Sequence, residues 1–132
     1  EIGIEVDINN TLDVNEVAQD ASAWDVYAMA NVQAPTGDPE YWFRVFALSD
    51  SAKNQGKYSN AQLDALDEQL SQEFDTAKRA DLAVQMQQIL LDDNAFVFCS
   101  FLKMSMISRS NVSNYTSHAC DYYQITADLD IE

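Results

Sequence analysis

Three stretches of the chain have the hydrophobic patterns of β-strands. Isoleucine and valine alternate with polar or small residues over residues 2–8, and this period of two predicts a half-buried strand. A mostly apolar stretch over residues 23–32 predicts a second strand that is buried on both faces. A long third strand is predicted over residues 95–109, because these fifteen residues contain no Gly, Pro, Asp or Glu.

Two helices are predicted around the second strand. A short helix is expected from Val14 to about Ala21, with Asp13 as its N-cap. A second helix is expected to begin at Pro39, since Asp38 is a favourable N-cap and proline is favourable at the first helical position. The residues that follow are apolar at helical spacing, so the bend before Asp38 carries the chain from a strand to a helix.

Two longer helices are predicted in the second half of the chain. Ser59 and Gln62 have the spacing of a capping box and predict the start of the first. Its apolar positions are Leu63, Leu66, Leu70 and Phe74. Asp75 and Thr76 are expected to end this helix and to cap the next, which runs over about residues 77–91. Its apolar positions are Leu82, Met86, Ile89 and Leu90. The two helices predict an αα-hairpin.

The order of predicted elements, β-α-β-α-α-α-β and a tail, is typical of an α/β domain. We expect a mixed sheet flanked by helices over residues 1–109 and a C-terminal tail over residues 110–132.

Composition limits the classes of partner. The 132 residues carry a formal net charge of -15, which disfavours nucleic acids and anionic membrane surfaces as partners. Hydrophobic residues make up 47% of the chain, enough to form a core. No segment has the length of apolar sequence that a membrane span needs.

Candidate catalytic residues are few. His118 is the one histidine, and Cys120 and Ser117 lie close to it, so a small hydrolase would have to use them. We expect instead a solvated loop histidine. Cys99 lies in an apolar run and is expected to be buried, although a Cys99–Cys120 disulfide stays open. No spacing of metal ligands is present, and no cofactor site is predicted.

Five motifs in a fixed order give the chain a resemblance to a known family. They are "GIEVDI", "WDVYAMA", "APTGDPEYWF", "GKYSNAQLDALDEQL" and "DTAKRADLAVQMQQILLDDNAFVFCSF". In this order the chain resembles the C-terminal portion of the solute-binding proteins of ABC transporters, in the dipeptide, oligopeptide and nickel class (family 5). The match spans most of residues 2–109.

The resemblance implies one lobe of a two-lobed protein that closes on its ligand and delivers it to a membrane permease. The N-terminal lobe and export signal are expected to be missing from this chain, and the tail to return toward that lobe. The full protein would work in the periplasm or on the outer face of the bacterial membrane, with or without a lipid anchor. No enzyme activity is implied.

The resemblance also points to the turn formed by Ala34, Pro35, Thr36 and Gly37 as a ligand-binding element in the cleft between the lobes. Peptide-binding members carry an acidic residue there, which pairs with the peptide's ammonium group. An ungapped alignment on Asp38 and Pro39 places Pro35 at that position. The turn is therefore more similar to that of the nickel and metallophore branch, with peptide binding as the alternative.

Overall fold

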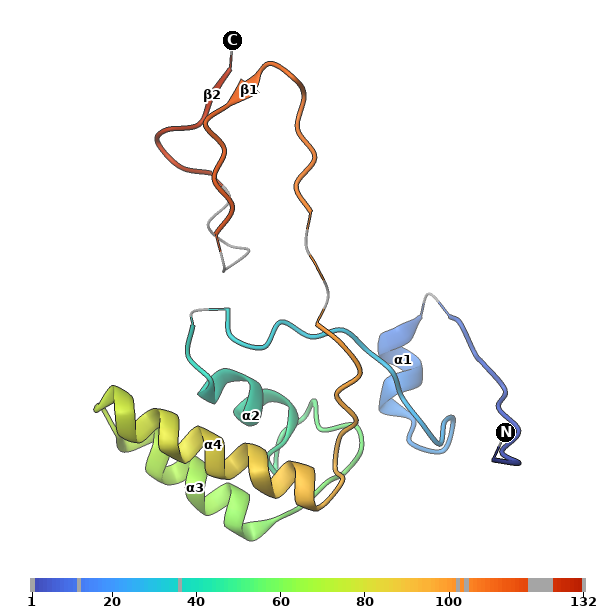
Figure 1. The fold of residues 1–132 in the computed structure, drawn as a ribbon. Helices are drawn as coiled ribbons and strands as arrows, with labels where there is room; N and C mark the ends of the chain where they lie inside the picture. Colours follow the sequence, from blue (N-terminus) through green and yellow to red (C-terminus); the bar gives the residue numbers. More distant parts are fainter. Residues whose placement is uncertain are drawn as a thin grey trace.

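A computed structural model describes residues 2–11, 13–35, 37–101, 103, 105–118 and 125–131. Within them the chain forms four helices and a two-stranded antiparallel sheet. The helices are α1 (Val14–Gln19), α2 (Glu40–Phe46), α3 (Ala61–Gln72) and α4 (Thr76–Asp92), and the strands are β1 (Val112–Ser113) and β2 (Asp130–Ile131). Figure 1 shows α2, α3 and α4 packed together, with the two strands at the other end of the molecule.

The predicted αα-hairpin is present and forms most of the core. α3 and α4 lie side by side, and α2 packs against α3 (Figure 1). Leu63, Leu70, Met86 and Leu90 are the largest fully buried side chains, and all four were expected on the apolar faces. Phe74 was wrongly assigned to the face of α3: the helix ends at Gln72, and the ring is 91% exposed.

α2 adds an aromatic layer to this core. Trp42 lies at its centre, because its ring is in contact with those of Phe43, Phe46, Phe96 and Phe98 at centroid distances of 5.1–6.1 Å. Phe96 and Phe98 come from the segment that follows α4. This segment is thereby fixed against the helices without forming a strand.

Three predicted strands, over residues 2–8, 23–32 and 95–109, are absent from the described parts of these segments. The alternating and continuous apolar patterns are present in the sequence. A strand also needs a neighbouring strand that completes its backbone hydrogen bonds. In the described residues β1 pairs with β2 alone. The described residues thus do not form the predicted mixed sheet, and side chains such as Ile2 and Ile8 are more than 80% exposed.

The helix starts agree with the sequence to within a residue, with two corrections. Asn60, not Ser59, is the N-cap of α3, and its side chain accepts hydrogen bonds from the amides of Gln62 and Leu63. Asp13 precedes α1 as expected, but its side chain makes no capping hydrogen bond. Asp75 caps α4 as predicted by accepting from the amide of Lys78.

Candidate functional site

The predicted ligand-binding turn is a tight reversal of the chain directly before α2. The Gly37 amide donates to the Ala34 carbonyl at 2.9 Å, which closes the turn. Gly37 has a φ of +82°, a conformation that side chains other than glycine rarely adopt. Thr36 lies outside the described residues. The positive φ at Gly37 therefore favours glycine at this position of the turn.

The turn is partly exposed and partly packed. Ala34 and Gly37 are exposed, but Pro35 is buried. Burial of Pro35 holds one side of the turn against the body and leaves its other side open to solvent.

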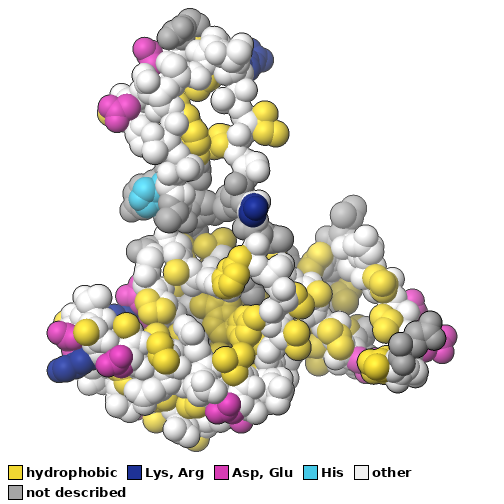
Figure 2. Space-filling model, in the orientation of Figure 1, with side chains coloured by type: hydrophobic (Ala, Val, Ile, Leu, Met, Phe, Trp, Pro, Cys, Tyr) yellow, Lys and Arg dark blue, Asp and Glu magenta, His cyan; other side chains and the backbone are white. Residues whose placement is uncertain are grey.

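An apolar groove of about 360 Å³ runs along the turn. Its lining combines residues of the turn region, α2, the end of α4 and the segment after α4: Gln33, Ala34, Pro39, Trp42, Phe43, Gln87, Leu90, Leu91, Phe98 and Phe101. Figure 2 shows hydrophobic side chains gathered over the middle of the helical body on the face that it presents. Among the described residues that line the groove there is no carboxylate, so they offer an ammonium ion no negatively charged partner.

A junction of charged side chains attaches the start of α2 to the hairpin. Arg79 of α4 donates from Nη2 to both carboxylate oxygens of Asp38, each at 2.8 Å, and to Glu40 at 2.9 Å. Asp38 also accepts from the Glu40 amide at 2.9 Å, so it caps α2 locally; Pro39 already has helical φ and ψ, although the helix is assigned from Glu40, one residue later than predicted. Partial burial opposes ionisation of Asp38, but the Glu40 amide and Arg79 outweigh it and lower its pKa.

The ion pairs at the start of α2 extend into the interface between α2 and α3. Glu40 pairs with Arg44 at 3.2 Å, and Arg44 reaches Asp67 at 3.4 Å. Asp67 is only 4% exposed, and its Oδ1 atom has no hydrogen-bond partner. Burial raises the pKa of the Asp67 carboxyl group, and the positive charge of Arg44 offsets this in part.

The "YSN" motif forms a second junction, between the start of α3 and the end of α4. The Tyr58 hydroxyl and the Asn60 side-chain amide both donate to Asp93, at 2.6 and 2.8 Å. Partial burial and the hydrogen bond to Asp93 raise the pKa of Tyr58 to about 12. This motif holds the ends of the hairpin together and lies apart from the turn.

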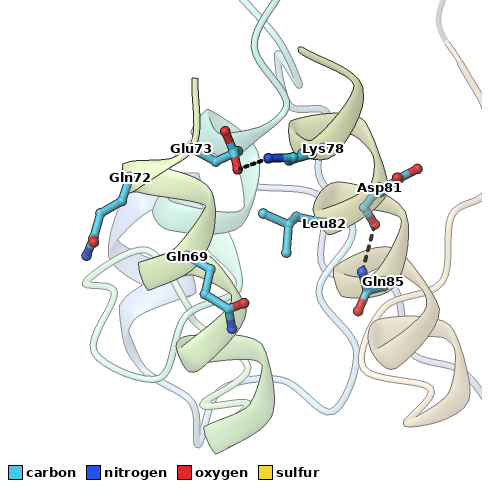
Figure 3. Close-up of a pocket in the computed structure, with 7 residues that line it drawn as sticks. All are labelled: Gln69, Gln72, Glu73, Lys78, Asp81, Leu82 and Gln85. Atoms are coloured by element: carbon cyan, nitrogen blue, oxygen red, sulfur yellow. Dashed lines mark hydrogen bonds and ion pairs between the residues drawn. The ribbon is translucent and has the colours of Figure 1, made fainter. Parts of the chain in front are cut away.

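A second hollow, of about 500 Å³, lies between α3 and α4 at the end of the hairpin where they are joined (Figure 3). Figure 3 shows Leu82 between the helices and polar side chains around it, with Lys78 3.7 Å from Glu73. Glutamines make up much of the remaining lining. These side chains form the solvated face of a helical pair, and nothing in them selects a ligand.

The candidate residues of the alternative hydrolase are only partly described by the structure. Cys99 is exposed, so the expectation of a buried cysteine was wrong: its segment runs along the surface. His118 lies in the described part of the tail, whereas Cys120 falls outside the described residues, and with it the proposed disulfide. Among the described residues there is no group of three His, Cys, Asp or Glu side chains that could hold a metal ion, and no helix that could cross a membrane.

Comparison with known proteins places this arrangement in context. The chain is 29% identical over 112 residues to the nickel-binding protein NikA of Staphylococcus aureus strain NCTC 8325 / PS 47. It also superimposes on a crystal structure of NikA from Staphylococcus aureus in complex with Ni(L-His)2, with a TM-score of 0.75 over 97% of the chain and 25% identity. The chain is similar to NikA in sequence and in fold over most of its own length. The resemblance to solute-binding proteins of family 5 is thereby confirmed. No family model matches the chain.

The likeness to NikA covers part of that protein. The aligned region spans 85% of this chain but 23% of the NikA sequence, and 28% of the chain in the crystal structure. The extended segments of this chain are included in the superposition, which covers almost its whole length. The fold is therefore that of a portion of a periplasmic-binding-protein-like structure.

Proposed function

We propose that this chain is one lobe of an ABC-transporter solute-binding protein that captures nickel as a chelate and delivers it to a membrane permease. The observation that carries the proposal is the superposition on NikA, whose crystal structure holds Ni(L-His)2. A chelated metal brings its own ligands, so the protein needs few metal-binding side chains. The absence of a metal-binding group from the described residues is compatible with such a ligand.

The turn of Ala34, Pro35, Thr36 and Gly37 is the part of this lobe that we assign to the ligand cleft. It borders the apolar groove through Ala34, and burial of Pro35 holds it in place. Neither the turn nor the described lining of the groove carries a carboxylate, so a peptide's ammonium group would find no counter-ion among these residues. This supports a metal chelate over a dipeptide or oligopeptide as the ligand.

In the full protein the second lobe closes the cleft, and residues 110–132 return toward that lobe. We place the full protein in the periplasm or on the outer face of the bacterial membrane, in the soluble or lipid-anchored form. A hydrolase that uses His118 and Cys120 has no support from the comparisons, because both matches are to a binding protein.

Native mass spectrometry of the full-length protein, purified from its own host, tests the proposal. The expected spectrum shows the protein together with the mass of nickel and a small organic chelator. Removal of the metal by a strong competing chelator should release both. A bound mass that corresponds to a peptide and persists without nickel would assign the protein to the peptide-binding branch instead.

A further inference from the structure

Two of the motifs meet at a single guanidinium group, through a pair of residues that lie 41 positions apart in sequence. Asp38 belongs to the "APTGDPEYWF" motif and Arg79 to the "DTAKRADLAVQMQQILLDD" motif. Nη2 of Arg79 lies 2.8 Å from each carboxylate oxygen of Asp38. Ion pairs of this kind give geometric definition as well as energy, because several charge-assisted hydrogen bonds converge on a planar group.

The other terminal nitrogen of Arg79 is bound to the end of α3. Nη1 donates to the carbonyl oxygens of Leu70 and Glu73, which lie at the C-terminal end of that helix. The Arg79 side chain is only 18% exposed. Arg79 of α4 thus binds the end of α3 through Nη1 and binds Asp38, the residue after the turn, through Nη2.

We propose that Arg79 is a positioning residue for the ligand-facing turn and acts through Asp38. Asp38 directly follows Gly37, so the position of its carboxylate restricts the backbone that leads out of the turn. The Gly37 amide donates to the Ala34 carbonyl and closes the turn, and burial of Pro35 packs one side of it. The contact of Arg79 with Asp38 links the exit of the turn to the hairpin, so Arg79 fixes the turn relative to the hairpin rather than contacting the ligand. The inference rests on the proposed function of the turn.

Lysine cannot replace arginine in this role. A lysine ammonium is a point donor on a flexible stem, whereas the guanidinium presents separate donors to Asp38 on one side and to Leu70 and Glu73 on the other. An ordinary surface ion pair would tolerate the exchange of arginine for lysine. Sensitivity to this exchange therefore separates a positioning role from a simple charge interaction.

The test uses the full-length protein with Ni(L-His)2 as the probe and compares Arg79→Gln, Asp38→Asn and the double variant by calorimetry. Asp38→Asn keeps an acceptor for the Glu40 amide and removes the charge. We expect each single variant to weaken the Kd about tenfold, and the double variant to be no weaker than Arg79→Gln, because both changes break one link. Arg79→Lys should resemble Arg79→Gln.

Asp75→Ala is the matched control. It removes the N-cap of α4 close to Arg79 but leaves the contacts of the turn in place. We expect it to lower the melting temperature without changing the Kd. A loss of affinity in Asp75→Ala equal to that in Arg79→Gln would mean that general destabilisation weakens binding, and would overturn the proposal.

A second readout does not depend on the ligand. Hydrogen exchange of the peptide that covers residues 33–40 should be faster in Arg79→Gln and in Asp38→Asn than in the wild type, and unchanged in Asp75→Ala. If the wild type binds no nickel complex, the proposed function fails while this measurement still decides the positioning role. If Arg79→Gln does not fold, Asp38→Asn breaks the link from the other side. Unchanged exchange in Asp38→Asn would overturn the inference.

Discussion

One guanidinium nitrogen of Arg79, Nη2, lies 2.8 Å from both carboxylate oxygens of Asp38. The contact joins the residue after a tight turn to the first turn of α4. It also explains why an aspartate is favourable at this place for two separate reasons. Asp38 caps α2 through the Glu40 amide and pairs with a cation from another element.

Substitution of the two partners should affect stability unequally. Asp38→Ala should lower the free energy of unfolding by about 1 kcal/mol, mainly through loss of the cap, because Asp38 is 43% exposed and solvent screens its ion pair. Arg79→Lys should lower it by about 1–3 kcal/mol, since it also removes hydrogen bonds from the end of α3. Urea denaturation of the two variants beside the wild type measures the difference. Equal losses would show that the contacts of Arg79 with α3 contribute little.

The start of α3 gives a direct test of the corrected cap. Asn60→Ala should destabilise the protein by about 1 kcal/mol, because the amides of Gln62 and Leu63 lose their acceptor. Ser59→Ala should have a smaller effect, since its hydroxyl contacts only the exposed hydroxyl of Ser49. The melting temperatures of both variants show which of the two residues is the N-cap. A larger loss for Ser59→Ala would restore the capping box as the start of the helix.

The turn itself can be changed at two positions with different consequences. Gly37→Ala should lower the free energy of unfolding by about 1 kcal/mol because its φ is +82°, although the added methyl group would meet no atom within 4 Å. Ala34→Trp should change the melting temperature of this chain little, because Ala34 is exposed, but should impair ligand binding by the full-length protein. If Ala34→Trp melts this chain severely and leaves full-length binding intact, the turn is a core element rather than part of the cleft.

The buried Asp67 carboxyl group should make stability depend on pH. Its pKa is raised in the folded protein, chiefly by burial, so the folded state binds this proton more tightly than the unfolded state does. The contribution of Asp67 to stability therefore increases as the pH falls through its folded-state pKa toward the ordinary value near 4. Asp38 has a lowered pKa, and its contribution is lost only at still lower pH, below the ordinary value.

The variant Asp67→Asn isolates this effect. At pH 7 we expect it to be as stable as the wild type or more stable by about 1 kcal/mol, because a buried charge with an unpartnered oxygen is removed. Arg44 is 55% exposed and keeps its pairing with Glu40. The free energy of unfolding of both proteins should be measured at pH 7 and pH 5. The stability of the wild type relative to the variant should be higher at pH 5. A wild type that loses ground at pH 5 would contradict the assigned direction of the pKa shift.

The helices could be predicted from the sequence, because helix capping and apolar spacing depend on residues that are close together in the chain. Asp75, Leu63 and Met86 occupy the places that capping and apolar spacing indicated. The glycine of the turn was likewise found from sequence, and its positive φ supplies the reason. The location of the turn at the edge of an apolar groove could not be predicted, because the groove is assembled from α2, α4 and the segment after α4.

The sequence could not show which segments that are distant along the chain contact one another. The period of two over residues 2–8 indicates which side chains would share a face, but not which segment would pair with them. Cys99 was expected to be buried because its neighbours are apolar, yet its segment forms no strand and leaves it exposed. In the sequence, Arg79 was recognised only as part of a motif. Its contact with Asp38 could not be predicted, because it forms only when α2 packs against the hairpin.

The most direct test of the central claim is calorimetric titration of Ni(L-His)2 into the full-length protein and, separately, into this chain of 132 residues. Nickel salt and a dipeptide serve as comparison ligands. We predict submicromolar binding of the nickel complex by the full-length protein, and nothing tighter than high micromolar for this chain, because half of a cleft buries too little of the ligand. Dipeptide binding without binding of the nickel complex, or submicromolar binding by this chain alone, would contradict the account.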